Sequence, residues 1–560
     1  MESNPTFKFL KGLNQKPDAD ITDGLVEATD VSYEKIGSVR SVPVNTEIEN
    51  FGAPLHSLSI EGLNEVDHFI EGIGTGLRVD SVDVLLGRVL SGSKVRMATH
   101  TDRLYFVDSS GTLLYYDPDL SGTFVYKAGS PVPSTAPTVS TGAGVGFTGD
   151  YNIKITFTNV HGFDGNPSTA ATVTTANNGI DLDVIATNAD TNYNVTGRKA
   201  WIQGGSNPFY PEYVLLETIS DNTTTASLGL LPADVDTTEL LETDNDLPST
   251  GYKYIVNHYG VILMAGHDEN SLVFSKSARP EQFPVLNSFG ISSSGDEIMN
   301  LLSWDGVTLI PTRKKIFQMI GSPGQGILQT NFYIKDTKSS YGTIASDSVV
   351  PTPYGMFFWS ENGIRVFSGN TSEIFSNEVD DEFNGRNKAD TPESLTHGSF
   401  SDDKVIWSYC YGTATTPNRS LVYDFKTQKW SVHNNGYYAF AADRKNNVLY
   451  AGTSTSLEKV YGGSTYRAWA ARTMDMTNEL NSVSSFKKVR VDMEGECSLE
   501  AYMDGTLRKT YSLSTSGRDQ VERLLPAYMA QRLSLRFSGT AKSTQDKIYS
   551  FRMVSEKEGE

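Results

Sequence analysis

The chain has 560 residues and a formal net charge of −20, from 47 basic and 67 acidic side chains. This length predicts several domains, and 38% hydrophobic with 20% charged residues excludes an intrinsically disordered protein. The acidic balance argues against gripping nucleic acid by neutralising phosphates, which requires clustered Lys and Arg.

The composition also favours an all-β fold. The 49 glycines supply turns, and the 27 tyrosines and 26 phenylalanines are typical of strands. Cys410 and Cys497 are the only cysteines, so we expect two reduced, buried thiols and no disulfide framework. The longest apolar runs are too short to span a bilayer, and the N-terminus lacks a secretory apolar stretch. We therefore expect no membrane segment.

The first 250 residues divide into three predicted parts. Residues 1–92 are weakly patterned and are expected to form an N-terminal arm with a propeller-closing segment. Residues 93–130 contain a clear hairpin and are predicted to be the first propeller blade. A proline-punctuated linker then opens 131–250, whose alternating strands predict an inserted fibronectin/Ig-like β-sandwich.

Residues 251–464 carry a repeat of polar turns and short apolar strands. The first apolar residue after each turn gives its phase, and the successive steps are 46, 49, 49 and 43 residues for Val261, Val307, Met356, Val405 and Val448. A strand repeat of about 40 to 50 residues is typical of propeller blades. With the insert removed, the spacing predicts a β-propeller of six blades.

The repeat stops after Tyr461, and residues 465–560 show a different strand pattern. Alternating segments at 486–493, 497–503, 533–537 and 548–553 predict a C-terminal β-sandwich domain.

The search for chemistry is mostly negative. The eight histidines include no pair at the spacing of a zinc-binding helix. Asp305, Glu361, Asp402 and Asp403 lie in blade turns and are the candidate carboxylates of a propeller glycosidase. Turn aspartates chiefly satisfy backbone groups, however. We therefore expect a protein that is not an enzyme, with no catalytic residues, no bound metal and no cofactor.

One acidic run stands out near the end of the predicted insert. It has two interpretations, a solvated loop or a surface that faces a channel or a basic partner subunit. Its members are Asp234, Asp236, Glu239, Glu242, Asp244 and Asp246.

Three stretches, 147–168, 256–283 and 421–431, carry a family resemblance. In order and spacing they resemble the tail nozzle, or packaged-DNA-stabilisation, proteins of short-tailed bacteriophages. The resemblance covers residues 100 to 460 and implies a ring, expected to be hexameric, in the virion tail, assembled in the host cytoplasm. Its implied partners are further copies of itself, adaptor or portal-side tail proteins, tail fibre or needle proteins, and double-stranded DNA that passes without specific binding.

Three functions remain open at this point. The first is the nozzle ring, which retains packaged DNA and conducts it at ejection; a net-negative ring repels phosphates, so DNA would pass without sticking. The second is a receptor- or glycan-binding tail protein. The third is a β-propeller glycosidase.

Overall fold

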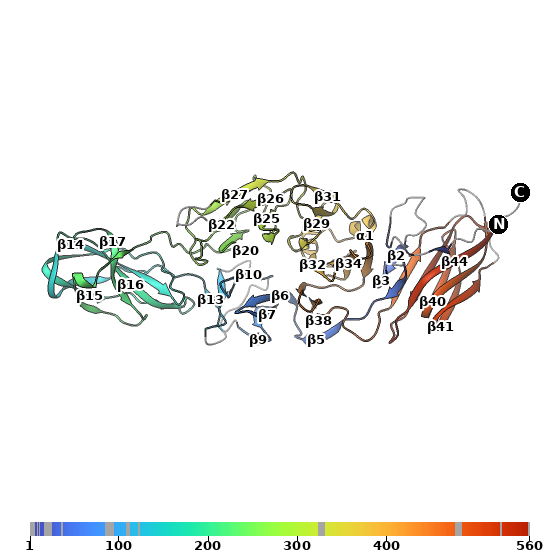
Figure 1. The fold of residues 1–560 in the computed structure, drawn as a ribbon, viewed down its shortest axis with the longest axis horizontal. Coiled ribbons are helices and arrows are strands. Elements are labelled where there is room, and N and C mark those ends of the chain that lie inside the picture. Colours follow the sequence, from blue (N-terminus) through green and yellow to red (C-terminus); the bar gives the residue numbers. More distant parts are fainter. Residues whose placement is uncertain are drawn as a thin grey trace.

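The computed structural model describes residues 6–7, 9, 12–15, 25–34, 37–84, 94–107, 113–120, 124–322, 331–476, 484–526 and 529–557. Strands make up 56% of it and helices 3%, which confirms the all-β prediction. Figure 1 shows an elongated molecule, with the inserted domain at one end, the propeller in the middle and a second domain beside both chain ends.

The propeller consists of seven antiparallel four-stranded blades in the described part of the chain; six are separate sheets, and blade 6 is part of a 14-stranded sheet. Blades 1 to 4 are β6 (Leu55–Leu63), β7 (Val66–Ile73), β8 (Gly76–Val79) and β9 (Val82–Asp83); β10 (Arg96–His100), β11 (Arg103–Val107), β12 (Leu114–Tyr116) and β13 (Tyr126–Lys127); β20 (Tyr254–His258), β21 (Val261–Ala265), β22 (Ser271–Phe274) and β23 (Ser288–Gly290); β24 (Leu302–Trp304), β25 (Val307–Pro311), β26 (Ile316–Ile320) and β27 (Tyr333–Asp336). Blades 5 to 7 are β28 (Val350–Thr352), β29 (Gly355–Ser360), β30 (Gly363–Phe367) and β31 (Ser372–Ile374); β32 (His397–Ser401), β33 (Lys404–Tyr409), β34 (Arg419–Asp424) and β35 (Lys429–His433); β36 (Ala439–Asp443), β37 (Val448–Gly452), β38 (Ser456–Lys459) and β5 (Thr46–Asn50).

Hydrophobic cores between successive blades close the ring. Separate clusters lie between blades 1 and 2, 2 and 3, 3 and 4, 4 and 5, and 6 and 7, and another joins blade 7 back to blade 1. The largest cluster joins blades 5 and 6, where Trp359 and Trp407 are fully buried, and continues into the second domain. Burying one such aromatic side chain contributes about 2 to 3 kcal/mol. Outer strand β5 pairs with β38, so the last blade takes a strand from near the N-terminus.

The predicted number of six blades is wrong, because the ring contains seven. The additional blade is β6–β9, formed by residues that the sequence pattern assigns to the N-terminal arm. Its outer strand, β9, has only two residues, and its middle strand β7 is half exposed at its start. An apolar pattern is weak in strands this short and this exposed, so the sequence repeat does not reveal the blade.

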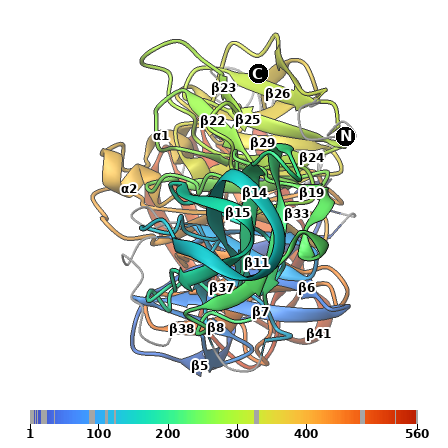
Figure 2. The same ribbon diagram turned by 90° about the vertical axis from the view of Figure 1, so that its left-hand side faces the viewer.

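The inserted domain leaves the propeller after β13 and returns at β20. Its strands form one continuous antiparallel sheet in the order β18-β15-β14-β16-β17-β19. The elements are β14 (Thr138–Asn159), β15 (Ala171–Val184), β16 (Val195–Gly204), β17 (Tyr210–Ile219), β18 (Ser227–Leu230), the 3-10 helix η1 (Pro232–Asp234) and β19 (Asp236–Leu240). Strand β14 is irregular between Gly142 and Phe147, where Gly144 and Gly146 have φ of +94° and +143°. The two ends of the sheet therefore fold over one core, as in a sandwich, although long strands connect the layers. Figure 2 shows this domain end-on, in front of the propeller.

The second domain combines both ends of the chain. The predicted C-terminal strands are present, and strands from the N-terminal residues complete their sheet. The elements are β39 (Trp469–Thr473), β40 (Ser484–Met503), β41 (Thr506–Leu524), β42 (Met529–Ala530), β43 (Leu533–Gly539), β44 (Lys547–Lys557), β1 (Thr6–Phe7), β2 (Leu25–Thr29), β3 (Val31–Tyr33) and β4 (Val39–Ser41). Thr29 of β2 also pairs with Val432 of β35, so this sheet continues into blade 6. Three short helices, η2 (Ser346–Ser348), α1 (Asp380–Asn384) and α2 (Asp390–Ser394), precede blades 5 and 6.

Candidate functional site

The first hairpin turns of the blades gather at one mouth of the propeller. Several are two-residue turns in which both residues have positive φ, such as Asp305-Gly306 (49° and 74°) and Asp402-Asp403 (49° and 54°). This conformation matches the twist of the flanking strands and favours Asn, Asp and Gly. The turn chemistry in the sequence therefore places carboxylates around the mouth.

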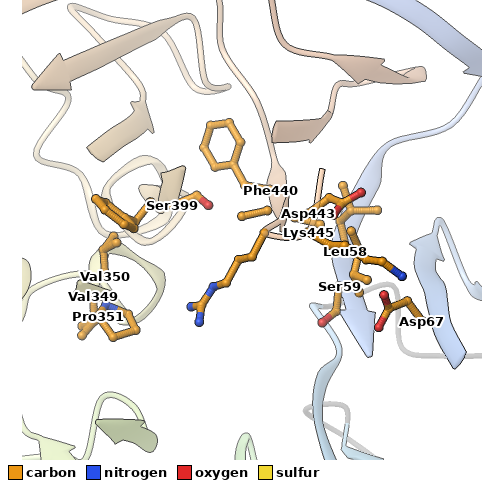
Figure 3. A pocket seen from close by; sticks show the side chains of 16 residues that line it. Leu58, Ser59, Asp67, Val349, Val350, Pro351, Ser399, Phe440, Asp443 and Lys445 are labelled. Atoms are coloured by element: carbon orange, nitrogen blue, oxygen red, sulfur yellow. The ribbon is translucent and has the colours of Figure 1, made fainter. Parts of the chain in front are cut away.

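Two adjoining cavities, here called the axial funnel, open at this mouth. Their volumes are about 530 and 550 Å³, and both are lined by Pro351, Phe400 and Arg444. The inner strands β6, β28, β32 and β36 form the wall of the first, and the turns after β24, β28, β32 and β36 form the second. In Figure 3, Asp67 and Lys445 lie on one side of the first cavity, and Val350 and Ser399 lie on the other.

Some charged groups of the axial funnel are already paired. Lys426 Nζ lies 2.7 Å from Asp402 and 3.4 Å from Asp403, and Lys404 Nζ lies 3.2 Å from Asp402. Burial disfavours the Asp402 carboxylate, but its hydrogen bond with Lys426 and the nearby Lys404 lower its pKa to about 2. A general acid of a glycosidase needs a raised pKa, so Asp402 is poorly suited to that role.

The other candidate carboxylates are separated. Asp305 lies in the turn between β24 and β25 and lines the axial funnel. Glu361 lies in the turn between β29 and β30 and is not among the residues that line either cavity. The structure thus brings Asp305, Asp402 and Asp403 together and leaves Glu361 apart.

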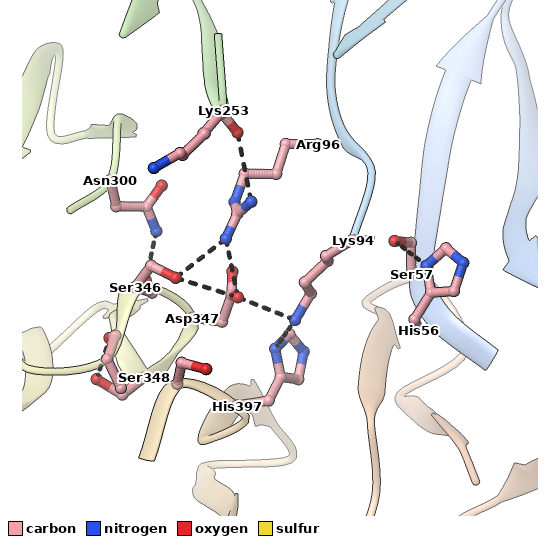
Figure 4. A network of polar contacts seen from close by, with 12 residues as sticks. His56, Ser57, Lys94, Arg96, Lys253, Asn300, Ser346, Asp347, Ser348 and His397 are labelled. Atoms are coloured by element: carbon pink, nitrogen blue, oxygen red, sulfur yellow. Dashed lines mark hydrogen bonds and ion pairs between the residues drawn. The ribbon is translucent and has the colours of Figure 1, made fainter. Parts of the chain in front are cut away.

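Deeper along the axis, four side chains form a polar clasp (Figure 4). Asp347, in η2, lies 3.0 Å from Arg96 Nη2 and 3.2 Å from Lys94 Nζ. Lys94 Nζ in turn lies 2.6 Å from His397 Nδ1, and His397 Nε2 accepts the backbone N–H of Phe440. The clasp connects blade 2 to blades 5, 6 and 7, so side chains occupy the axis of the propeller.

Burial and neighbouring charges shift the pKa values of the clasp residues. Burial lowers the pKa of Lys94 to about 8, and burial together with the Lys94 charge lowers the pKa of His397 to about 3. Burial opposes ionisation of Asp347, but Arg96 and Lys94 outweigh it and hold the pKa of that carboxyl well below its usual range. Asp347 is therefore the anion on which both cations depend.

We expect Asp347→Asn to lower the free energy of unfolding by about 2 to 3 kcal/mol, because two largely buried cations lose their shared anion. Chemical denaturation followed by tryptophan fluorescence measures the effect. The matched control is Glu297→Gln, which removes an exposed ion pair with Arg313 and should cost under about 1 kcal/mol. Equal losses in the two variants would contradict a structural role for the clasp.

The acidic run predicted from the sequence begins in η1, just before edge strand β19, and continues through β19 to the junction between the insert and blade 3. Asp234 and Asp236 accept local hydrogen bonds from Leu231 and Thr238. The other four contact cations or amides: Glu239 with Lys199 (2.6 Å), Glu242 with Lys276 (3.0 Å) and Arg279, Asp244 with Lys276 (2.6 Å), and Asp246 with the Asn166 amide (2.7 Å). Part of the run therefore fastens the insert to the propeller, and a channel-facing role stays a prediction for Asp234 and Asp236.

A buried carboxylate at this junction was not singled out by the sequence. Glu281 is fully buried and accepts hydrogen bonds from Gly129 N (2.6 Å), Asn159 Nδ2 (2.7 Å) and Tyr105 OH (3.0 Å). His161 lies between Glu281 (2.8 Å) and Asp117 (3.0 Å). The available signal was a histidine in a polar loop of the insert, but no spacing in the sequence connects it with these two carboxylates.

These contacts predict a pH dependence of the junction. Burial opposes the His161 charge, but Asp117 and Glu281 outweigh it and raise the pKa of His161. A raised folded-state pKa stabilises the protein fully below the unfolded value of about 6.5, and this stabilisation is lost as pH rises through the folded value. We therefore expect this part of the stability to be lost as pH rises above about 6.5 through the raised folded-state pKa of His161, and the loss to be smaller in His161→Gln. An identical loss in denaturation experiments on the variant would assign it to other groups.

The described part of the chain has no group of three His, Cys, Asp or Glu residues arranged to hold a metal ion. Within the same residues, no helix has the length and apolar character needed to cross a membrane. Cys410 and Cys497 are buried, and burial raises the pKa of these thiols to about 11 and about 12.

Comparisons with known proteins add little. No protein-family model matches the chain, and no curated protein matches it. Among solved structures, a crystal structure of Raptor from Chaetomium thermophilum is similar over 75% of this chain, with 10% identity and a TM-score of 0.33. The matched part spans 29% of the Raptor chain.

Proposed function

We propose that the protein is a structural component of a short-tailed bacteriophage, the tail nozzle ring that continues the DNA channel below the head-to-tail adaptor. In this proposal several copies, expected to be six, surround the channel. The ring retains packaged DNA in the virion and conducts it at ejection. The chain has no catalytic part in this role.

The observation that carries the proposal is the order of the parts along the chain. The resemblance implies a propeller interrupted by an inserted β-domain, and the chain leaves the propeller after β13 for the six-stranded insert and resumes it at β20. The three stretches that carry the resemblance begin in β14, in blade 3 and in β34. These positions agree with the insert opening, the blade that resumes after the insert and the late blade strand that the resemblance implies, and they support the proposal.

The polar clasp and the charge agree with this proposal. Because side chains fill the propeller axis, duplex DNA has no path through a single propeller, and the channel must lie between subunits. A net charge of −20 per chain would repel DNA phosphates from the walls of that channel. DNA would then keep its counterions as it passes, because no Lys or Arg side chains would displace them from the phosphates.

Negative-stain electron microscopy of the full chain, alone and mixed with a phage adaptor ring, tests the proposal. We expect a ring with an open central channel, formed either by the protein alone or only on the adaptor. A persistent monomer that ignores the adaptor would contradict the nozzle role.

The acidic run gives a second test. We expect Asp234→Asn combined with Asp236→Asn to raise the affinity of the assembled ring for DNA about twofold to tenfold, because exposed negative charge is removed. DNA ejection should also become slower. The matched control is Glu297→Gln combined with Asp336→Asn, which removes the same charge from two exposed ion pairs of the propeller. Equal DNA affinity in wild type and double variant, with intact rings, would remove Asp234 and Asp236 from the mechanism.

A further inference from the structure

Some charged side chains of the axial funnel form no ion pair with any other described residue. Arg444, in the turn after β36, is exposed and makes no hydrogen bond or ion pair with any described residue, although it lines both cavities. Lys445 beside it is also exposed, and its charge helps to lower the pKa of the neighbouring Asp443. Two cations at the mouth are thus available to an external anion.

Two carboxylates of the funnel are also available. Asp67, on β7, and Asp305, after β24, are exposed, and neither carboxylate is paired within the described residues. This contrasts with Asp402 and Asp403, which share Lys426 in the same cavity. The free groups of the funnel therefore include both acceptors and cations.

Aromatic faces lie between these groups. Trp304 and Phe400 are half-buried and line the second cavity, and Phe400 also lines the first. The Trp304 indole N–H donates to the Thr352 carbonyl oxygen at 3.3 Å, which fixes the ring in the wall. Such fixed aromatic surfaces among a few polar groups are typical of ligand sites.

We propose that the axial funnel binds an acidic saccharide. The sugar carboxylate pairs with Arg444 and Lys445, since charge-assisted hydrogen bonds to guanidinium are strong and directional. Sugar hydroxyls donate to Asp67 and Asp305, and the apolar face of a sugar ring lies against Trp304 or Phe400. The site does not depend on the proposed nozzle role, because it lies within one chain.

Other ligands fit these groups less well. A nucleic acid would need a stripe of cations, but the funnel offers two beside two free carboxylates. An acidic peptide would satisfy Arg444 and Lys445, but its further carboxylates would be repelled by Asp67 and Asp305. A saccharide supplies hydroxyl donors at those positions, so it uses all four groups.

Isothermal titration of the full chain with acidic oligosaccharides tests the proposal. The probes are tetragalacturonate, a mannuronate tetramer, a hyaluronan tetrasaccharide and sialyllactose, with neutral maltotetraose and tetraglutamate for comparison. We expect at least one acidic oligosaccharide to bind, at least roughly tenfold more tightly than maltotetraose, which lacks the charged bond. Binding of no acidic oligosaccharide, or tighter binding of tetraglutamate, would overturn the proposal.

Variants then locate the site. Arg444→Gln should weaken the bound saccharide roughly tenfold, and Trp304→Leu should weaken it as well. The matched control is Lys335→Gln, an exposed cation on β27 outside both cavities, which should leave affinity unchanged. Unchanged thermal unfolding of each variant shows that folding is intact. Full affinity in folded Arg444→Gln would place the ligand elsewhere and overturn the assignment.

Discussion

Glu281→Ala is expected to lower the free energy of unfolding by about 3 to 5 kcal/mol and to loosen the inserted domain from the propeller. The carboxylate is fully buried and accepts hydrogen bonds from Gly129, Asn159 and Tyr105, besides its contact with His161. Its loss leaves these donors without an acceptor and leaves His161 with one carboxylate partner. Because the donors come from blade 2 and from the insert, the damage should concentrate at their junction.

Limited proteolysis and tryptophan fluorescence measure this result. Cleavage in the linker 131–137 should become faster, while Trp201, buried in the insert, should keep its folded environment. Glu281→Gln is the conservative comparison, since it keeps the size and one acceptor oxygen. A variant whose linker resists protease as the wild type does would show that other contacts hold the insert.

We expect Gly342→Ala to lower the free energy of unfolding by about 3 kcal/mol. A Cβ at this position would lie 1.9 Å from the Thr312 carbonyl oxygen and 2.7 Å from the Arg313 carbonyl carbon. The segment is held there because Thr343 N donates to the same Thr312 oxygen at 3.0 Å. The backbone leading to blade 5 must therefore move away from blade 4.

Urea denaturation followed by tryptophan fluorescence measures this effect, because Trp304, Trp359, Trp407 and Trp430 lie in the propeller. Gly290→Ala on β23 is the matched control, since its Cβ would meet no atom within 4 Å. That substitution should change stability by no more than about 0.5 kcal/mol. Equal midpoints for the two variants would mean that the backbone relieves the contact with Thr312 without loss of stability.

The repeat from Val261 to Val448 was readable because it combines two signals. Turn residues suited to positive φ stand before apolar strands that are buried on both faces, as in β21 and β29. Blade 1 has the first signal, in Asn64 and Glu65 with φ of 49° and 63°, but lacks the second. An apolar repeat alone therefore undercounts the blades.

The candidate sites were less predictable than the fold. The acidic run was visible as composition, but its partners Lys276 and Arg279 come from blade 3, and no local pattern indicates this pairing. The same holds for Glu281 and His161, which meet only because the insert folds back on the propeller. The axial funnel depends on turns from four blades, so its lining became apparent only from the closed ring.

The pairing of β5 with β38 determines when the propeller can close during synthesis. Asn50 lies opposite Ser456, so the earlier partner leaves the ribosome long before the later one, by tens of seconds at roughly 5 to 20 residues per second. Throughout that interval β5 has no partner strand, while the insert, whose strands pair only with one another, can already fold. Closure of the ring thus waits until β38 has been synthesised, and a chain that stops before residue 456 retains an open blade edge, a surface that chaperones bind and that promotes aggregation.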